Sequence, residues 1–186
     1  MITSADGLPY DCISLLPCPT SLGGVIVLTG NAIIYVDQTA RRIALPVNGW
    51  SSRTSDIQLL SLPPNEQLRS LDLERCRSAF VDNKMFFVIL KDGTVYPVEI
   101  VADGKNVSRL VMAPALVQST IPAVIRQVSD EYLFIGCAVG PSLLLKTVQV
   151  EEVLHEDHQM SPNPAAVDLG SSMDLDDDDG LCLSHV

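Results

Sequence analysis

The amino-acid sequence predicts an all-β fold: an incomplete β-propeller of about three blades, each a four-stranded antiparallel sheet, followed by a disordered acidic tail. The main observation is a layout that occurs three times. Two apolar runs flank a turn that contains glycine, with the turn glycines at Gly30, Gly93 and Gly140. Repeated hairpins are typical of propeller blades, and the unequal intervals between the glycines indicate a repeat with insertions. In addition, no segment has the sustained apolar period of a helix.

The first hairpin is predicted in residues 22–44, which also include its return strand. Apolar runs at 25–28 and 33–36 flank the Thr-Gly-Asn turn at 29–31. A short outer strand is expected before it, at residues 11–16.

The middle of the chain is predicted to hold a long loop and then a second sheet. Residues 49–65 are rich in Gly, Ser and Pro, which favours a loop or insertion. Residues 67–73 alternate apolar and polar side chains, the period of a half-buried strand. Further strands are expected at 78–81, 85–90, 95–100, 107–112 and 123–128, with turns at Asp82-Asn83 and Asp103-Gly104.

The third hairpin consists of apolar runs at 132–135 and 143–145, and the composition changes soon after it. The C-terminal residues are rich in charge and poor in strand formers, so they bury too little apolar area to offset their ordering entropy. We therefore expect a partial propeller at 1–153 and a disordered acidic tail or loop at 154–186.

The charge is distributed unevenly along the chain. The net charge is −11, but residues 151–186 hold ten acidic residues and no Lys or Arg, whereas residues 1–150 hold 13 acidic and 12 basic residues. A nearly neutral folded part gives no electrostatic case for nucleic-acid binding, which needs a basic face.

The cysteines and the apolar runs indicate the cellular compartment of the protein. The chain has five cysteines, an odd number, and none forms a Cys-x-x-Cys pair. This pattern favours reduced, buried thiols in a cytosolic or nuclear protein. We expect no signal peptide, because residues 1–10 lack a basic start and an apolar stretch. We expect no membrane span, because the longest apolar stretch, at 22–36, is short and interrupted by a turn.

The histidines, which many catalytic and metal sites need, are confined to the tail. The three histidines are His155, His158 and His185, so the folded part has no Ser-His-Asp or Cys-His combination. His155, His158, Cys182 and His185 could supply zinc ligands, but the acidic linker between the two pairs favours solvated tail residues. We expect no catalytic residue, no metal and no cofactor.

Four residues are candidates for contact with RNA or a protein partner. Arg69, Arg75 and Arg77 form the nearest approach to a basic patch, and Arg75 and Arg77 would share a face if their segment were a strand. Neighbouring carboxylates favour a salt-bridged surface, with RNA contact as the alternative. For Trp50 we favour a buried position beneath its loop over an exposed anchor for a partner.

Three segments resemble a known family. They are YLFIGCAVGPSLLLK at 132–146, GGVIVLTGNAIIYVDQ at 23–38 and KMFFVILKDGTVYPVEI at 84–100. All three are similar to strand pairs of the large propeller proteins related to the UV-damaged-DNA-binding scaffold. The SLLLK ending most resembles the largest subunits of the cleavage and polyadenylation specificity factor. The resemblance covers residues 9–153. The sequence departs from the family pattern in the turn between residues 135 and 143. Cys137-Ala138 stands where the family commonly has polar or basic residues, and Pro141 stands where Asn or Asp is usual, which affects any contact made by that turn.

The resemblance implies a non-catalytic scaffold in the nucleus. Such a subunit would hold a WD-repeat partner and a zinc-finger partner that read the polyadenylation signal, would contact RNA mainly through them, and would leave the nuclease to another subunit. The segment resembles the closing part of the family's first propeller. Since family members are several-fold longer, we expect the chain to be a fragment. We expect no membrane and no small-molecule substrate.

Two other classes remain open. One is a propeller adaptor for a ubiquitin ligase or for the spliceosome, as in the related splicing factor 3b subunit. The other, less favoured, is a hydrolase with a carboxylate-based site, for which the candidates are Asp72, Glu74, Asp130 and Glu131. Asp130 and Glu131 are adjacent at a predicted strand entry, so their side chains would point to opposite faces.

Overall fold

The computed structural model describes residues 4–54, 70–129 and 131–146. All of them belong to residues 1–149, the first of two units into which the chain divides. The second unit, residues 150–186, lies outside the described residues, and so does the predicted acidic tail.

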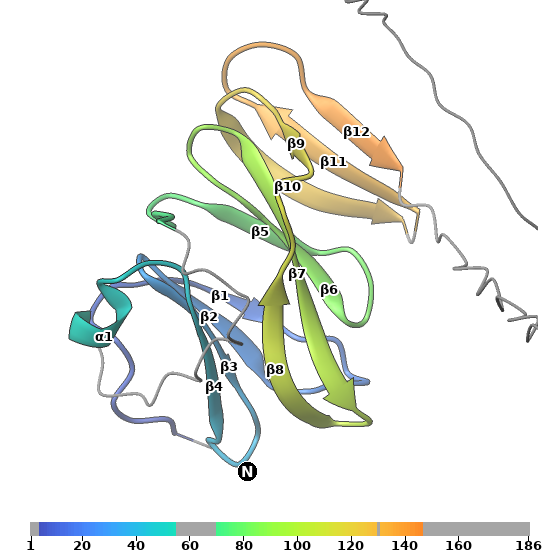
Figure 1. Cartoon of the computed structure of the whole chain (residues 1–186). Helices are drawn as coiled ribbons and strands as arrows, with labels where there is room; N and C mark the ends of the chain where they lie inside the picture. The colour runs from blue at the N-terminus through green and yellow to red at the C-terminus, as the bar shows by residue number, and fades with distance from the viewer. Residues whose placement is uncertain (1–3, 55–69, 130, 147–186) are drawn as a thin grey trace, which may run out of the picture. The chain divides into compact units, whose positions relative to one another are not determined.

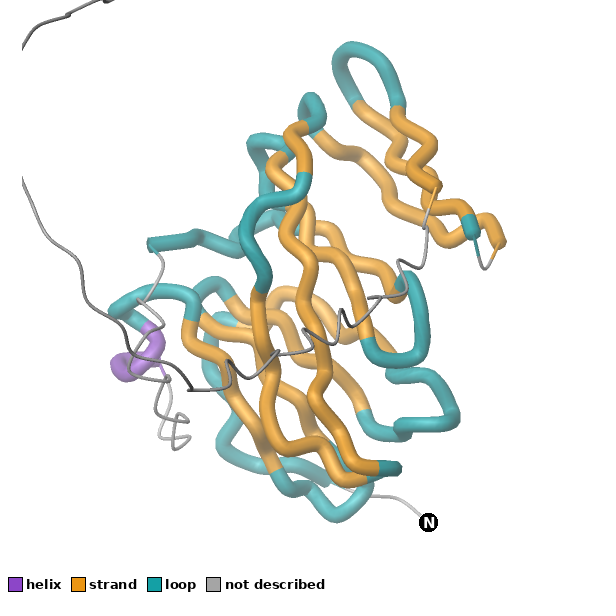
Figure 2. Tube along the Cα trace, turned by 45° about the vertical axis from the view of Figure 1, so that its right-hand side comes forward, coloured by secondary structure: helices purple, strands orange, loops and turns teal. Residues whose placement is uncertain are grey.

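The described part is almost entirely β-structure, arranged in three antiparallel sheets (Figures 1 and 2), as the sequence predicts. The first sheet has the order β1 (Cys12–Pro17), β2 (Val25–Thr29), β3 (Ala32–Val36) and β4 (Arg42–Pro46). The second has β5 (Arg77–Phe80), β6 (Met85–Ile89), β7 (Thr94–Asp103) and β8 (Asn106–Met112), with β9 (Val117–Gln118) also paired to β7. The third has β10 (Pro122–Ser129), β11 (Tyr132–Cys137) and β12 (Leu143–Lys146).

The three predicted hairpins are strand pairs of these sheets: β2–β3 and β6–β7 are the central pairs of the first and second sheets, and β11–β12 includes the edge strand β12 of the third. The first turn shows why they form locally. The Thr29 hydroxyl is buried, accepts hydrogen bonds from the backbone N–H groups of Asn31 and Ala32, and donates one to the Ala32 carbonyl. The only helix among the described residues is α1 (Ser51–Thr54), a single turn in the predicted loop.

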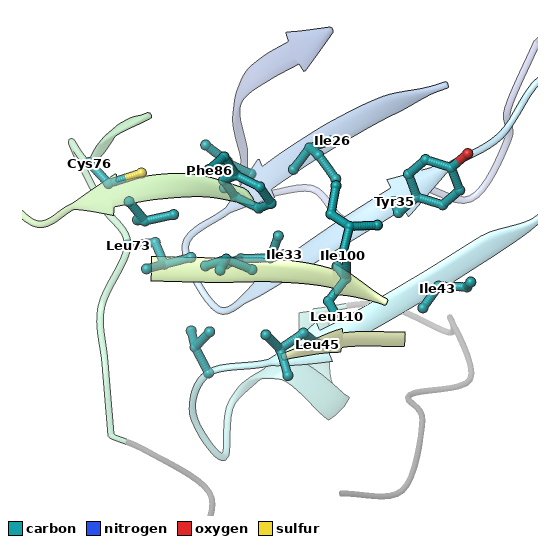
Figure 3. Packing of buried hydrophobic residues seen from close by; sticks show 14 of the residues in the cluster. Ile26, Ile33, Tyr35, Ile43, Leu45, Leu73, Cys76, Phe86, Ile100 and Leu110 are labelled. Atoms are coloured by element: carbon teal, nitrogen blue, oxygen red, sulfur yellow. The ribbon is translucent and has the colours of Figure 1, made fainter. Parts of the chain in front are cut away.

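The hydrophobic core lies between successive sheets. One cluster joins the first and second sheets, and Figure 3 shows Ile26, Ile33, Phe86 and Ile100 meeting there. A second cluster joins the second and third sheets. Adjacent residues of β6 serve different clusters, with Phe86 in the first and Phe87 in the second. Since side chains alternate along a strand, β6 is buried on both faces, which accounts for its continuous apolar run.

The first and third sheets each have one face that points away from the second sheet, and these two outward faces differ. On the first sheet, Val27 and Ile34 are buried and pack with Ala5 and Leu8 of the N-terminal segment. On the third sheet, large apolar side chains of the outward face remain exposed, among them Val124, Tyr132, Phe134 and Leu144.

The strand predicted at 67–73 is wrong where the structure describes it, at residues 70–73. The backbone N–H of Leu71 donates to the Val47 carbonyl, and that of Leu73 donates to the Gly30 carbonyl. The segment is therefore held by isolated hydrogen bonds to two loops instead of a ladder. Its alternation arises because Leu73 enters the core while Asp72 points to solvent.

Candidate functional site

Two of the predicted contact residues, Trp50 and Arg75, lie at one end of the sheets, which we call the α1 end. It comprises residues 10–11, 30–31, 47–54, 70–75, 91–93, 113–121 and 138–142, and so includes the β2–β3, β6–β7 and β11–β12 turns (Figure 1). The turns that join β3 to β4, β5 to β6, β7 to β8 and β10 to β11 lie at the opposite end of the sheets.

Trp50 immediately precedes α1 and is 62% exposed, so the favoured prediction of a buried position is wrong. The space beneath the loop is filled instead by Val47, Asn48 and Ser51, which are all buried. The Arg53 guanidinium carbon lies 4.8 Å from the centre of the Trp50 ring, a cation–π distance. An exposed indole stacked with a guanidinium is a side-chain pair suited to recognition.

Asn48 holds the backbone of Trp50 in place. Its side-chain oxygen accepts a hydrogen bond from the Trp50 N–H at 2.9 Å. Its amide nitrogen donates to the Asn31 side chain at 2.9 Å and to the Leu71 carbonyl at 2.6 Å. Asn31 in turn donates to the Asp11 carboxylate at 2.7 Å. A polar network thus joins the segment before β1, the β2–β3 turn and the loop after β4, and it gives Trp50 a rigid support.

The structure does not join the predicted arginines into one patch. Arg69 lies outside the described residues. Arg75 is in a turn with φ of 61°, so it does not share a strand face with Arg77. The Arg77 side chain donates to the Ala123 carbonyl at 3.1 Å and to the Cys76 carbonyl at 3.3 Å, and thereby links the second sheet to the third. Contact of these residues or Trp50 with RNA or a partner stays a prediction.

The ion pair near these arginines involves a different cation. Asp72 pairs with Lys91 of the β6–β7 turn at 2.7 Å. The pKa of Asp72 is lowered, first by the hydrogen bond from Lys91 and then by that from the Glu74 N–H. Sequence reasoning missed Lys91, and it missed Asn31 and Asn48 as structural residues. The available signals were their positions in Gly-containing turns, where Asn commonly bonds to backbone.

The carboxylates proposed for a hydrolase do not converge in the described part. Asp72 and Glu74 lie at the α1 end, whereas Glu131 lies at the opposite end, 3.7 Å from Lys146; Asp130 lies outside the described residues. Among the described residues, no group of three His, Cys, Asp or Glu side chains could hold a metal ion. The zinc alternative involves residues outside that part. Within it, no helix has the length and apolarity of a membrane span.

The described thiols are unpaired, and burial reduces the reactivity of two of them. Cys76 is buried and Cys18 is half-buried, and burial raises the pKa of each thiol to about 11. Cys12 is exposed, in contrast to the predicted burial of the thiols, and its pKa is raised by partial burial and by Asp11. A thiol with a raised pKa is a weak nucleophile at neutral pH.

Comparison with known proteins gives one consistent group. No protein-family model matches the chain. The chain is 26% identical over 171 residues to cleavage and polyadenylation specificity factor subunit 1 of Drosophila melanogaster, covering 88% of the chain and 12% of that protein. It is 31% identical over 146 residues to the protein of the same name from Arabidopsis thaliana, and the match covers 78% of the chain and 10% of that protein. It is 27% identical over 151 residues to protein CFT1 of Yarrowia lipolytica, and the match covers 78% of the chain and 12% of that protein. The chain thus spans about a tenth of the length of these curated relatives.

Proposed function

Because the chain is homologous to one segment of the cleavage and polyadenylation specificity factor subunit 1 family, we propose that it acts in pre-mRNA 3′-end cleavage and polyadenylation. The observation that carries this proposal is the similarity over at least 78% of the chain to relatives from an insect and a plant. The role is that of a non-catalytic scaffold that binds other proteins in the nucleus. Its partners are the WD-repeat and zinc-finger subunits of the polyadenylation complex, and RNA is contacted mainly through them.

The described residues support a scaffold more than a catalyst. The candidate carboxylates Asp72 and Glu131 each face a lysine, and they lie at opposite ends of the sheets. Burial keeps the Cys18 and Cys76 thiols protonated at neutral pH. Three sheets joined through continuous cores form a stiff support for surface loops, the usual location of binding residues.

The proposal is tested by tagging the 186-residue chain, purifying it from nuclear extract and quantifying the proteins that remain bound. We expect enrichment of polyadenylation subunits over cullins and spliceosomal proteins. The matched control is Ile33→Asp, which places a charge in the core between the first and second sheets and should abolish the enrichment. Enrichment of cullins or spliceosomal proteins instead would favour the adaptor alternative, and enrichment of none of these would contradict a scaffold role.

A further inference from the structure

The exposed large apolar residues outside the strands all lie at the α1 end. Among the residues that the structure describes there are five of them, at 54–102% exposure: Tyr10, Trp50, Leu116, Ile121 and Val139. They come from the loops of all three sheets. An isolated exposed apolar residue needs no explanation, but a gathering on one surface indicates an interaction site.

Backbone and side-chain contacts link the segments of this end to one another. The Leu73 N–H donates to the Gly30 carbonyl at 3.0 Å, and Asp72 pairs with Lys91 at 2.7 Å, so the first and second sheets are joined there. The Ser119 N–H donates to the Gly93 carbonyl at 2.8 Å, which ties the β6–β7 turn to the segment that leads into the third sheet.

The same chain of contacts reaches the last turn. The Ala138 N–H donates to the Ile121 carbonyl at 2.8 Å, so Val139 is held beside the segment that contains Ile121. In Figure 1 these turns follow the left and upper margin of the sheets, from α1 to the β11–β12 turn.

The opposite end has a different character. Three of its turns each contain both a carboxylate and a cation: Asp37 with Arg41, Asp82 with Lys84, and Asp103 with Lys105. The Asp37 and Asp82 side chains accept backbone hydrogen bonds within their own turns. The exposed apolar loop residues therefore lie at the α1 end, whereas three turns of the opposite end are charged.

The charge of the α1 end selects the kind of partner. Its described charged residues are four acidic and three basic: Asp11, Asp72, Glu74, Asp92, Arg53, Arg75 and Lys91. A surface with a balance of −1 does not neutralise phosphates, so RNA is a poor complement. Exposed Trp and Tyr together with Arg are the residue types that dominate protein–protein interfaces.

We propose that the α1 end is a docking surface for a protein partner that presents apolar side chains, centred on Trp50 with its stacked Arg53 and extending to Val139. The inference rests on the proposed function, since it names the surface through which the scaffold holds a subunit. The rigid mounting of Trp50 by Asn48 reduces the ordering cost of binding.

The experiment uses matched valines. Val139 at the α1 end is 63% exposed, and Val128, near the opposite end, is 65% exposed. The 186-residue chain is prepared as wild type, Val139→Ser, Val128→Ser and Trp50→Ala. The readout is the amount of each polyadenylation subunit that wild type retains after RNase treatment. We expect Trp50→Ala to lower retention of one subunit by about tenfold and Val139→Ser to lower it by about twofold to threefold, whereas Val128→Ser should leave it unchanged.

The outcomes separate this inference from the proposed function. If wild type retains no polyadenylation subunit, the proposed function fails and the inference fails with it. If wild type retains subunits but Val139→Ser does not differ from Val128→Ser, the docking surface alone is refuted. Loss of wild-type retention on RNase treatment would show that RNA occupies the surface and would also refute it. Circular dichroism of each variant checks folding, and the exposed Val139→Ser tests the idea even if Trp50→Ala misfolds.

Discussion

At the scale of single residues, Asn48 and Asp72 show how the α1 end is built. Asn48 is buried and its side chain makes three hydrogen bonds. Asp72 is half-exposed and joins the irregular segment before β5 to the β6–β7 turn through Lys91. Asn48 sets the position of Trp50, and Asp72 ties the segment before β5 to the β6–β7 turn of the same sheet.

The lowered pKa of Asp72 predicts a pH dependence of stability. Because its folded-state pKa lies below the ordinary 3.8, its contribution to stability is present above pH 3.8 and is lost as pH falls through the lowered value. Wild type should exceed Asp72→Asn in melting temperature by about 1–3 °C near neutral pH, since the pair is half-exposed, and the two should converge near pH 2. Thermal melts followed by circular dichroism measure this difference. Lys91→Met, which removes the other partner, should behave alike; a difference that persists at the acidic end would contradict the assignment.

At the scale of elements, the β6–β7 turn depends on Gly93. Its φ is +90°, which side-chain-bearing residues rarely adopt, and a Cβ there would meet the carbonyl oxygens of Ser119 and Thr120. The turn therefore needs glycine both for its backbone conformation and for the close approach of the segment that leads from β8 into β10.

Gly93→Ala should lower the free energy of unfolding by about 2–4 kcal/mol, the sum of left-handed strain and overpacking. Gly104 in the β7–β8 turn is the matched control, because its φ is +58° but no atom lies within 4 Å of a Cβ there. Gly104→Ala should cost about 1 kcal/mol, from strain only. Equilibrium urea unfolding followed by circular dichroism gives both values. Equal losses would mean that the contact with residues 119–120 does not matter.

Elements were predictable where their cause is local. The β2–β3 and β6–β7 hairpins follow from apolar runs around glycine turns, and the structure places both as expected. The strand at 67–73 failed because Leu71 and Leu73 alternate for another reason: they bond to Val47 and Gly30, which are far away in sequence. Alternation of apolar and polar side chains indicates which side chains are buried. A segment can bury every second side chain without pairing with a neighbouring strand.

At the scale of the whole described part, the outward face of the third sheet exposes apolar side chains. Phe134 and Leu144 lie opposite each other in register, and both are exposed, next to exposed Val124. An apolar sheet face and the free edge of β12 favour contact between copies of the chain.

We expect the wild-type chain to self-associate at micromolar concentrations and Leu144→Lys to shift it toward monomer, as measured by sedimentation velocity. Leu15→Lys on β1 is the matched control, since Leu15 is 65% exposed and Leu144 is 61% exposed. It should have little effect, because Val27, its neighbour in register, is already buried in the cluster that includes Ala5 and Leu8. A monomeric wild type with a sharp two-state transition would contradict the prediction.

The sequence by itself determined the all-β class, the three hairpins and the resemblance to the polyadenylation family, because these depend on residue alternation, turn chemistry and short motifs that are local in the chain. The tertiary structure decided the exposure of Trp50, the pairing of Asp72 with Lys91 and the gathering of apolar loops at the α1 end. Each of these depends on contacts between residues that are distant in sequence. Burial and pairing of that kind follow from how sheets pack on one another, and local patterns do not encode it.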